Sequence, residues 1–271
     1  MAPVAAGTGA AVGLGAVDPT AAVLALVVAL ALQVAVNYAN DYSDGVRGTD
    51  SDRVGPMRLV GSGAAPARSV LAATGCAFAV AGVAGLALVA RSGQWWLLAV
   101  GVLAVLAAWF YTGGSKPYGY AGLGEVAVFV FFGLVAVLGT TWTQAGAVDV
   151  GAWAAAVGVG STACALLVVN NLRDIPTDTA AGKGTLAVRL GDRGTRRLFV
   201  SLLLLPAVCA LVAVAASPWA QLALFAVPLA VTPLRVVNSG ATGSLLVPAL
   251  GSTGRYSLAF GVLLGLGLAL G

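Results

Sequence analysis

The sequence predicts an all-α membrane protein in which nine helices cross the bilayer. Of its 271 residues, 59% are apolar and only 9% are charged, which lies far outside the range of soluble domains. Apolar runs recur along the chain, and most are near the roughly 20 residues that a helix needs to cross about 30 Å of hydrocarbon. No linker or soluble domain interrupts this pattern. Residues 1–271 are therefore expected to form one polytopic domain.

The apolar segments differ in length. They lie at residues 3–17, 20–38, 67–90, 94–112, 121–141, 150–170, 197–216, 218–237 and 256–271. The first would span only ~22 Å as a helix, so we expect a truncated first crossing. The break at Ser217 and Pro218 is short, and an even number of crossings is the main alternative.

The distribution of charge predicts the orientation. If Met1 is cytoplasmic, every Lys and Arg except Arg91 falls on the cytoplasmic side, as the positive-inside rule requires. We therefore expect a multi-pass protein of the cytoplasmic membrane, with its two long loops, residues 42–66 and 171–196, facing the cytoplasm. The net charge of +4 is scattered between helices and forms no basic stripe, which argues against nucleic acid as a partner.

Two acidic clusters follow apolar segments at this same face. They consist of Asn37, Asp41 and Asp44, and of Asn170, Asp174 and Asp178. The first three are spaced i, i+4 and i+7, which places them on one face of a helix. The second cluster repeats this spacing up to Asp174, and Asp178 continues it if the helix survives Pro176. An ionisable group in hydrocarbon costs about 2.5–3.5 kcal/mol, so each cluster needs a partner.

The chemistry of the clusters favours magnesium. Carboxylate and amide oxygens, without His or Cys, suit a hard cation. Because Mg²⁺ usually takes one or two carboxylates plus substrate phosphates, two facing clusters could hold two ions across one diphosphate. The alternative is that the acids only cap helices at the membrane interface. The three cysteines lie singly in apolar segments and indicate packing residues rather than a zinc site.

Basic residues near the clusters could bind the oxygens of a diphosphate. The candidates are Arg58, Lys116, Arg173 and Lys183. Charge-assisted hydrogen bonds to phosphate favour this role, whereas the positive-inside rule alone would also explain why these residues lie here. The later run of Arg193, Arg196 and Arg197 indicates an anchor to lipid headgroups.

Four longer motifs surround these residues. They are N37-Y-A-N-D-Y-S-D44, G55-P-M-R-L-V-G-S-G63, Y111-T-G-G-S-K-P-Y-G-Y120 and N170-N-L-R-D-I-P-T-D178. Together they resemble the membrane aromatic prenyltransferases of the UbiA superfamily, and most closely its menaquinone-pathway branch. The resemblance runs from about residue 3 to the C-terminus. It implies a helical bundle around a central cavity.

The resemblance also implies a reaction. A polyprenyl group would be transferred from polyprenyl diphosphate to 1,4-dihydroxy-2-naphthoate with decarboxylation, giving demethylmenaquinol. It implies Mg²⁺ as the cofactor and four catalytic acids, Asp41, Asp44, Asp174 and Asp178. The tail would lie in an apolar tunnel open to membrane lipid, since it cannot be carried through water cheaply. Candidates for its lining are Trp109, Phe129, Phe131 and Phe132.

The sequence departs from the family pattern in three places. Gly48 occupies the third acidic position of the first motif, and the acid comes later, at Asp50. A Tyr-x-x-x-Lys element is replaced by Tyr111 and Lys116, which are separated by four residues. The basic, Trp-containing entry to the first helix lies before the first residue here, so we expect a longer native N-terminus.

Other functions remain as alternatives. Within the family, 4-hydroxybenzoate or another aromatic compound could be the acceptor. A CDP-alcohol phosphotransferase also carries acidic motifs at a membrane surface, but D44-G-V-R47 only begins like its motif. A transporter would be the alternative outside the enzymes. It would place acids in the middle of its helices, whereas the clustered acids here lie at helix ends.

Overall fold

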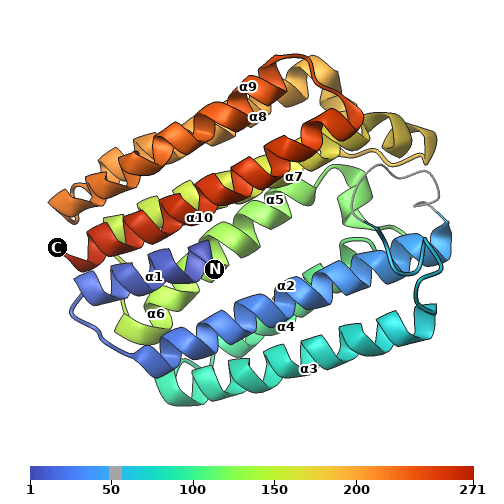
Figure 1. The fold of residues 1–271 in the computed structure, drawn as a ribbon. Coiled ribbons are helices and arrows are strands. Elements are labelled where there is room, and N and C mark those ends of the chain that lie inside the picture. Colours follow the sequence, from blue (N-terminus) through green and yellow to red (C-terminus); the bar gives the residue numbers. More distant parts are fainter. Residues whose placement is uncertain (49–56) are drawn as a thin grey trace.

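The computed structural model describes residues 1–48 and 57–271, which form a bundle of helices (Figure 1). Its elements are α1 (Ala2–Gly13), α2 (Pro19–Arg47), α3 (Ala67–Ser92), α4 (Leu97–Phe110), η1 (Tyr118–Ala121), α5 (Gly124–Val128), η2 (Phe129–Leu138), α6 (Gly139–Ala145), α7 (Val150–Ala180), α8 (Leu186–Ala213), η3 (Pro218–Ala230), α9 (Val231–Asn238), η4 (Gly243–Leu246) and α10 (Val247–Ala269). The elements α5, η2 and α6 form one rod, and η3 and α9 form another. Each predicted apolar segment thus corresponds to a helical rod in the described part of the chain.

Six of these rods are long and apolar enough to cross a membrane. They are α2, α3, Gly124–Ala145, α7, α8 and Pro218–Asn238. The apolar helix α4 has 14 residues and α1 has 12, so α1 is shorter than the predicted segment 3–17. The all-α architecture is confirmed, and the number of complete crossings stays a prediction.

Two helices continue beyond the apolar runs that predicted them. Helix α2 extends to Arg47, and α7 passes through Pro176 and ends at Ala180. The prediction of loops from residues 42 and 171 is therefore wrong, and residues 186–196 also belong to a helix, α8. Hydropathy predicts where a chain leaves the hydrocarbon, but it does not predict where a helix ends. The backbone hydrogen bonds of a helix can continue into polar surroundings. Gly48 then ends α2 with a φ of 71°, a conformation that glycine adopts readily.

Helix α7 is the centre of the bundle. Within its apolar stretch 72% of the residues are buried, against 22% in α2. In Figure 1, α2, α3 and α4 form one edge, α8 and α9 form the other, and α7 and α10 lie between them. This arrangement leaves one side of α2 facing the acidic end of α7.

Small residues bring the helices close together. A Cβ atom on Gly9 of α1 would lie 2.0 Å from the carbonyl oxygen of Gly265 in α10. A Cβ atom on Gly133 of η2 would lie 2.8 Å from the Cα of Gly160 in α7. Glycine is needed at these contacts because membrane helices pack through close backbone approach. Gly82, by contrast, faces open space.

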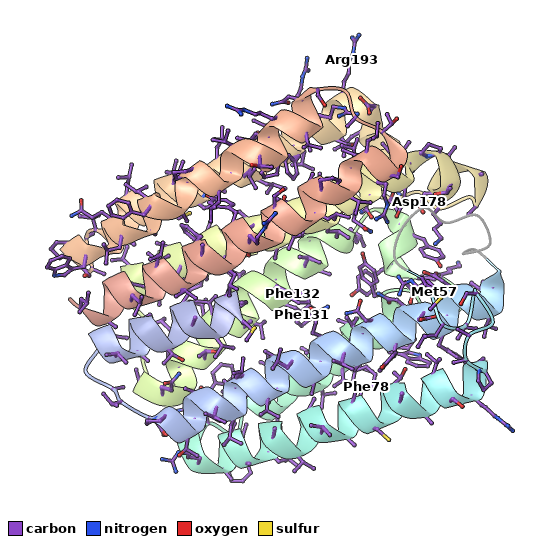
Figure 2. The ribbon with its side chains drawn as sticks, viewed as in Figure 1. Met57, Phe78, Phe131, Phe132, Asp178 and Arg193 are labelled. Atoms are coloured by element: carbon purple, nitrogen blue, oxygen red, sulfur yellow. The ribbon has the colours of Figure 1, made fainter. Side chains whose placement is uncertain are left out.

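The arginines at the start of α8 have different surroundings, and their anchoring to lipid headgroups stays a prediction. Arg193 projects away from the bundle in Figure 2. Arg196 instead forms a bidentate ion pair with Asp192, with both N–O distances at 2.8 Å. It also donates to the carbonyl oxygens of Val237 and Ala241. Arg196 therefore ties α8 to the end of α9.

Candidate active site

A cavity of about 680 Å³ opens between the polar ends of α2 and α7. Its lining comes from both acidic clusters, from the segment after the undescribed residues, and from the loops that precede η1 and α8. The lining residues are Gln33, Asn37, Tyr38, Asn40, Asp41, Asp44, Met57, Arg58, Leu59, Tyr111, Thr112, Gly119, Tyr120, Leu166, Leu167, Asn170, Asn171, Arg173, Asp174, Thr177, Asp178, Lys183, Thr185 and Leu250. All six predicted metal-ligating residues therefore meet at one cavity. Figure 2 shows Asp178 and Met57 at this end of the bundle.

The first cluster lies along the last turns of α2. Asn37 is exposed at the cavity, and its side-chain amide donates to the backbone oxygen of Gln33. Asp41 is only 5% exposed and accepts hydrogen bonds from the backbone amides of Leu59 and Val60. The segment that carries Arg58 is thereby attached to α2.

Asp44 has different partners from those of Asp41. It accepts a hydrogen bond from the hydroxyl of Tyr120, and the ammonium of Lys183 lies 3.6 Å from its carboxylate. The same ammonium lies 4.7 Å from the centre of the Tyr120 ring, which favours a cation–π contact. Arg47 lies 5.7 Å from that ring centre and donates to the carbonyl oxygens of Thr112 and Gly114. Asp44, Tyr120 and Lys183 thus join three separate segments.

The second cluster lies on α7, where Asp174 is paired within the helix itself. Arg173 is 3% exposed and holds Asp174 through two hydrogen bonds of 2.7 Å each. Its remaining terminal nitrogen, Nη1, is buried without a hydrogen-bond partner among the described residues. The turn after the helix is closed by the Lys183 amide, which donates to the Asp178 carbonyl oxygen at 2.8 Å. This bond brings Lys183 back beside the helix end.

The structure separates the predicted basic residues into two groups. Arg58, Arg173 and Lys183 line the cavity. Lys116 is exposed and is not among the lining residues, although Tyr111 of the same motif is. Lys116 was a natural sequence candidate because it lies between a Gly pair and a Pro. The bonds from Arg47 instead draw the residues before it toward α2.

Some cavity residues were missed from the sequence. Tyr120 stands at the end of a recognised motif, but nothing local indicated its bond to Asp44. Asn171 donates to the buried carboxylate of Glu125, whose second oxygen has no partner among the described residues. The adjacent Asn170 and Asn171 could have indicated from the sequence that a second amide side chain lies at the site. The partner, Glu125, lies at the start of a different rod and could not be paired with them from spacing alone.

Two further predictions have different outcomes. Asp50 lies outside the described residues, while the glycine that replaces an acid at position 48 is explained by the end of α2.

The proposed tail-lining residues Trp109, Phe129, Phe131 and Phe132 are absent from the cavity lining. Figure 2 shows Phe131 and Phe132 between the η2 rod and α2. Their contact with a tail stays a prediction.

Most of the side-chain atoms that the cavity offers as metal ligands are oxygens. Within residues 1–48 and 57–271, no three acidic, histidine or cysteine side chains converge on one point as a finished metal site. A cation that binds here must therefore take part of its coordination from a ligand. This pattern matches Mg²⁺, which commonly takes one or two carboxylates and completes its shell with phosphate oxygens and water.

Comparison with known proteins gives the family. The model of the UbiA prenyltransferase family matches residues 1–240. This chain belongs to that family. A UbiA-family relative, the 1,4-dihydroxy-2-naphthoate octaprenyltransferase of Mycobacterium tuberculosis, is 55% identical over 271 residues, which cover 100% of this chain and 92% of the relative. Together with the six apolar rods, membership of the family identifies a multi-pass membrane protein.

Solved structures show the same UbiA fold. The apo structure of a UbiA homologue from Aeropyrum pernix K1 matches with a TM-score of 0.74 and 17% identity, covering 99% of this chain and 97% of that chain. A UbiA homologue from Archaeoglobus fulgidus bound to DMAPP and Mg²⁺ matches with a TM-score of 0.57 and 17% identity, covering 97% and 96%. The predicted UbiA-type bundle is therefore confirmed.

Proposed function

We propose that this protein transfers a polyprenyl group from its diphosphate to 1,4-dihydroxy-2-naphthoate with loss of carbon dioxide. The product is demethylmenaquinol, on the route to menaquinone. The observation that carries the proposal is the meeting of both acidic clusters with Arg58, Arg173 and Lys183 around one cavity. Full-length similarity to the mycobacterial octaprenyltransferase supports the choice of acceptor.

The cavity residues fit a magnesium diphosphate. The residues that would hold Mg²⁺ are Asn37, Asp41, Asp44, Asn170, Asp174 and Asp178. Their donors are all oxygens, and the described acids are not gathered into a complete cage, which leaves coordination positions for phosphate. The Archaeoglobus fulgidus homologue, whose fold is shared, was solved with DMAPP and Mg²⁺. When bound, Mg²⁺ would supply Lewis-acid stabilisation of the leaving diphosphate.

The chain's own cations would bind the diphosphate directly. Lys183 pairs with Asp44 and Arg173 with Asp174 in the structure, so each cation already lies beside an acid. With a magnesium diphosphate bound, the acids would hold the metal and the cations would bind the anionic oxygens. Both kinds of group would therefore exchange an internal partner for a substrate partner, and Arg58 would add a third donor.

The proposed reaction also suits a chain without histidine. The bond between the prenyl carbon and the diphosphate oxygen breaks, and its electron pair leaves with the diphosphate. The carboxyl-bearing ring carbon forms the new bond. The carboxylate then departs as carbon dioxide and returns its bonding pair to the ring. Because a prenyl cation replaces a carbon dioxide unit, no net proton is gained or lost, and the demand on a general base is small.

The proposed topology places this cavity at the cytoplasmic face, with nine crossings and an open side for the tail. Trp95, Trp96, Trp142, Trp153 and Trp219 occur at the rod ends opposite the cavity. Tryptophan is enriched at membrane interfaces, and Lys and Arg are enriched on the cytoplasmic side. Arg91, the one basic residue predicted outside, is paired with Asp18 at the start of α2, far from the acidic end.

The test uses the purified protein in lipid vesicles with Mg²⁺ and a polyprenyl diphosphate. The acceptor is either carboxyl-labelled 1,4-dihydroxy-2-naphthoate or 4-hydroxybenzoate. We expect labelled carbon dioxide and a prenylated naphthalene product by mass spectrometry, both lost in excess EDTA. Prenylation of hydroxybenzoate alone, or unchanged turnover in EDTA, would overturn the acceptor or the magnesium requirement respectively.

A further inference from the structure

The carboxylate of Asp41 binds the protein backbone at both oxygens. Oδ2 accepts a hydrogen bond from the Leu59 amide at 2.8 Å, and Oδ1 accepts one from the Val60 amide at 3.0 Å. The side chain is almost fully buried beneath this segment. Two consecutive amides are thus held by one carboxyl group, an arrangement that fixes both the position and the direction of the chain.

Gly45 gives a second, independent observation of the contact between α2 and the segment that contains Leu59 and Val60. It lies one helical turn after Asp41 and therefore on the same face of α2. A Cβ atom at Gly45 would lie 2.5 Å from the Cβ and Cγ1 of Val60 and 3.1 Å from the amide nitrogen of Gly61. Any larger residue would push the segment away. Helix α2 thus offers an acceptor for the segment and, one turn later, the space that it needs.

The attached segment is itself a compact turn. The amide of Ser62 donates to the Arg58 carbonyl at 3.1 Å, and that of Gly63 donates to the Val60 carbonyl at 3.0 Å. The amide of Ala65 closes the turn on the Leu59 carbonyl, also at 3.0 Å. Because the turn is braced internally, attachment at Leu59 and Val60 sets the position of the whole segment.

Arg58 immediately precedes the two attached amides. Its side chain is partly buried and lines the cavity, and its Nη1 lies 3.4 Å from the backbone oxygen of Asn37. Asn37 is one turn before Asp41 on the same helix face. The attachment therefore holds the Arg58 guanidinium beside Asn37 of α2.

We propose that Asp41 and Gly45 anchor residues 57–65 to α2, and that Asp41 is a positioning residue for Arg58. The anchoring is independent of the proposed function. Only the naming of a prenyl diphosphate as the ligand of Arg58 rests on it. This role is exerted on backbone amides and is additional to the metal ligation proposed for Asp41, and it predicts an effect on the protein without any metal or substrate.

Hydrogen–deuterium exchange of the full chain in detergent, without Mg²⁺ or substrate, tests the anchoring directly. In Asp41→Ala we expect the amides within residues 57–65 to exchange at least 10-fold faster than in the wild type. Gly45→Val should give the same increase with the carboxylate intact. Asp44→Ala is the matched control and should leave this segment unchanged. Peptides from α7 report any global unfolding, and Asp41→Asn, which keeps one acceptor, should be intermediate.

Binding of a non-reactive prenyl thiodiphosphate in the presence of Mg²⁺ tests the consequence for Arg58. Asp41→Ala and Arg58→Ala should each raise the Kd about 10-fold, and the double variant should be no more than twofold weaker than the weaker single variant. Such non-additivity is expected when one residue acts through another. Independent effects, giving about 100-fold in the double variant, would overturn the positioning role.

The two measurements also separate this proposal from the proposed function. Unchanged exchange of residues 57–65 in Asp41→Ala would overturn the anchoring, whatever the enzyme's substrate. A wild-type protein that binds no prenyl thiodiphosphate would count against the proposed function instead, and the exchange result would still decide the anchoring.

Discussion

The ends of α2 and α7 carry the same spacing of amide and carboxylate side chains but hold them in different ways. On α7, Asp174 is satisfied by its sequence neighbour Arg173, within a helix that is mostly buried. On α2, Asp41 is satisfied by backbone amides 18 and 19 residues away, and Asp44 by Tyr120, which is 76 residues away. Asp174 is therefore held within a single helix, whereas Asp41 and Asp44 are held by segments that are distant in sequence.

Two motifs with the same residue spacing can therefore respond differently to mutation. The α7 cluster contains an ion pair whose arginine side chain is buried, so a change to that pair should act on stability as well as on activity. The α2 cluster depends on several contacts between segments, so single changes there should act on the geometry of the site. Variants at the two ends can separate these expectations.

The largest effect is expected when an acid of either cluster is removed. Asp44→Ala and Asp174→Ala should each lower kcat by on the order of 10³-fold, because each would remove a ligand from the charge that stabilises the leaving diphosphate. Product formation in lipid vesicles measures this loss. Turnover near the wild-type rate in either variant would contradict the proposed role of that cluster.

Breaking the ion pair on α7 should affect stability next. Arg173→Leu leaves the largely buried Asp174 carboxylate without its partner, which costs about 3–5 kcal/mol when such a pair is broken from one side. We expect a lower midpoint of thermal unfolding in detergent, followed by circular dichroism. The double variant Arg173→Leu, Asp174→Leu should recover most of the stability and remain inactive. A double variant as unstable as the single one would argue against this pair as the cause.

A smaller effect is expected from the contacts that assemble the α2 cluster. Tyr120→Phe removes the hydroxyl that binds Asp44 but keeps the ring beside Lys183. A hydrogen bond to a charged group contributes about 1.5–3 kcal/mol, so we expect at least a roughly 10-fold rise in the apparent KM for Mg²⁺. Tyr118→Phe is the control, because the Tyr118 hydroxyl binds the Ala107 carbonyl outside the cavity lining. Equal KM values in the two variants would remove Tyr120 from the assembly of the site.

The smallest effect is expected at Lys116. Its side chain is exposed and outside the cavity, so Lys116→Ala should change the KM for prenyl diphosphate less than about twofold. Lys183→Ala should raise the same KM about 10-fold, because a charge-assisted contact to the diphosphate is lost. Steady-state kinetics on the two variants compare them directly. A larger effect at Lys116 would return it to the binding site.

Much of the architecture was predictable because its signals are local. Apolar runs identified the helical rods, and the i, i+4, i+7 spacing correctly gathered Asn37, Asp41 and Asp44 on one cavity-facing side of α2. The ends of helices were less predictable. Pro176 argued for a break that α7 does not have, and hydropathy placed the end of α2 several residues before Gly48.

The sequence by itself determined the helical class, the family and the two clusters, since hydropathy and residue spacing act over a few turns of one chain. Only the tertiary structure decided which partners those acids have. It brought Leu59 and Val60 to Asp41, Tyr120 and Lys183 to Asp44, and left Lys116 outside. These choices depend on contacts between segments that are distant in sequence, and no local period encodes such contacts.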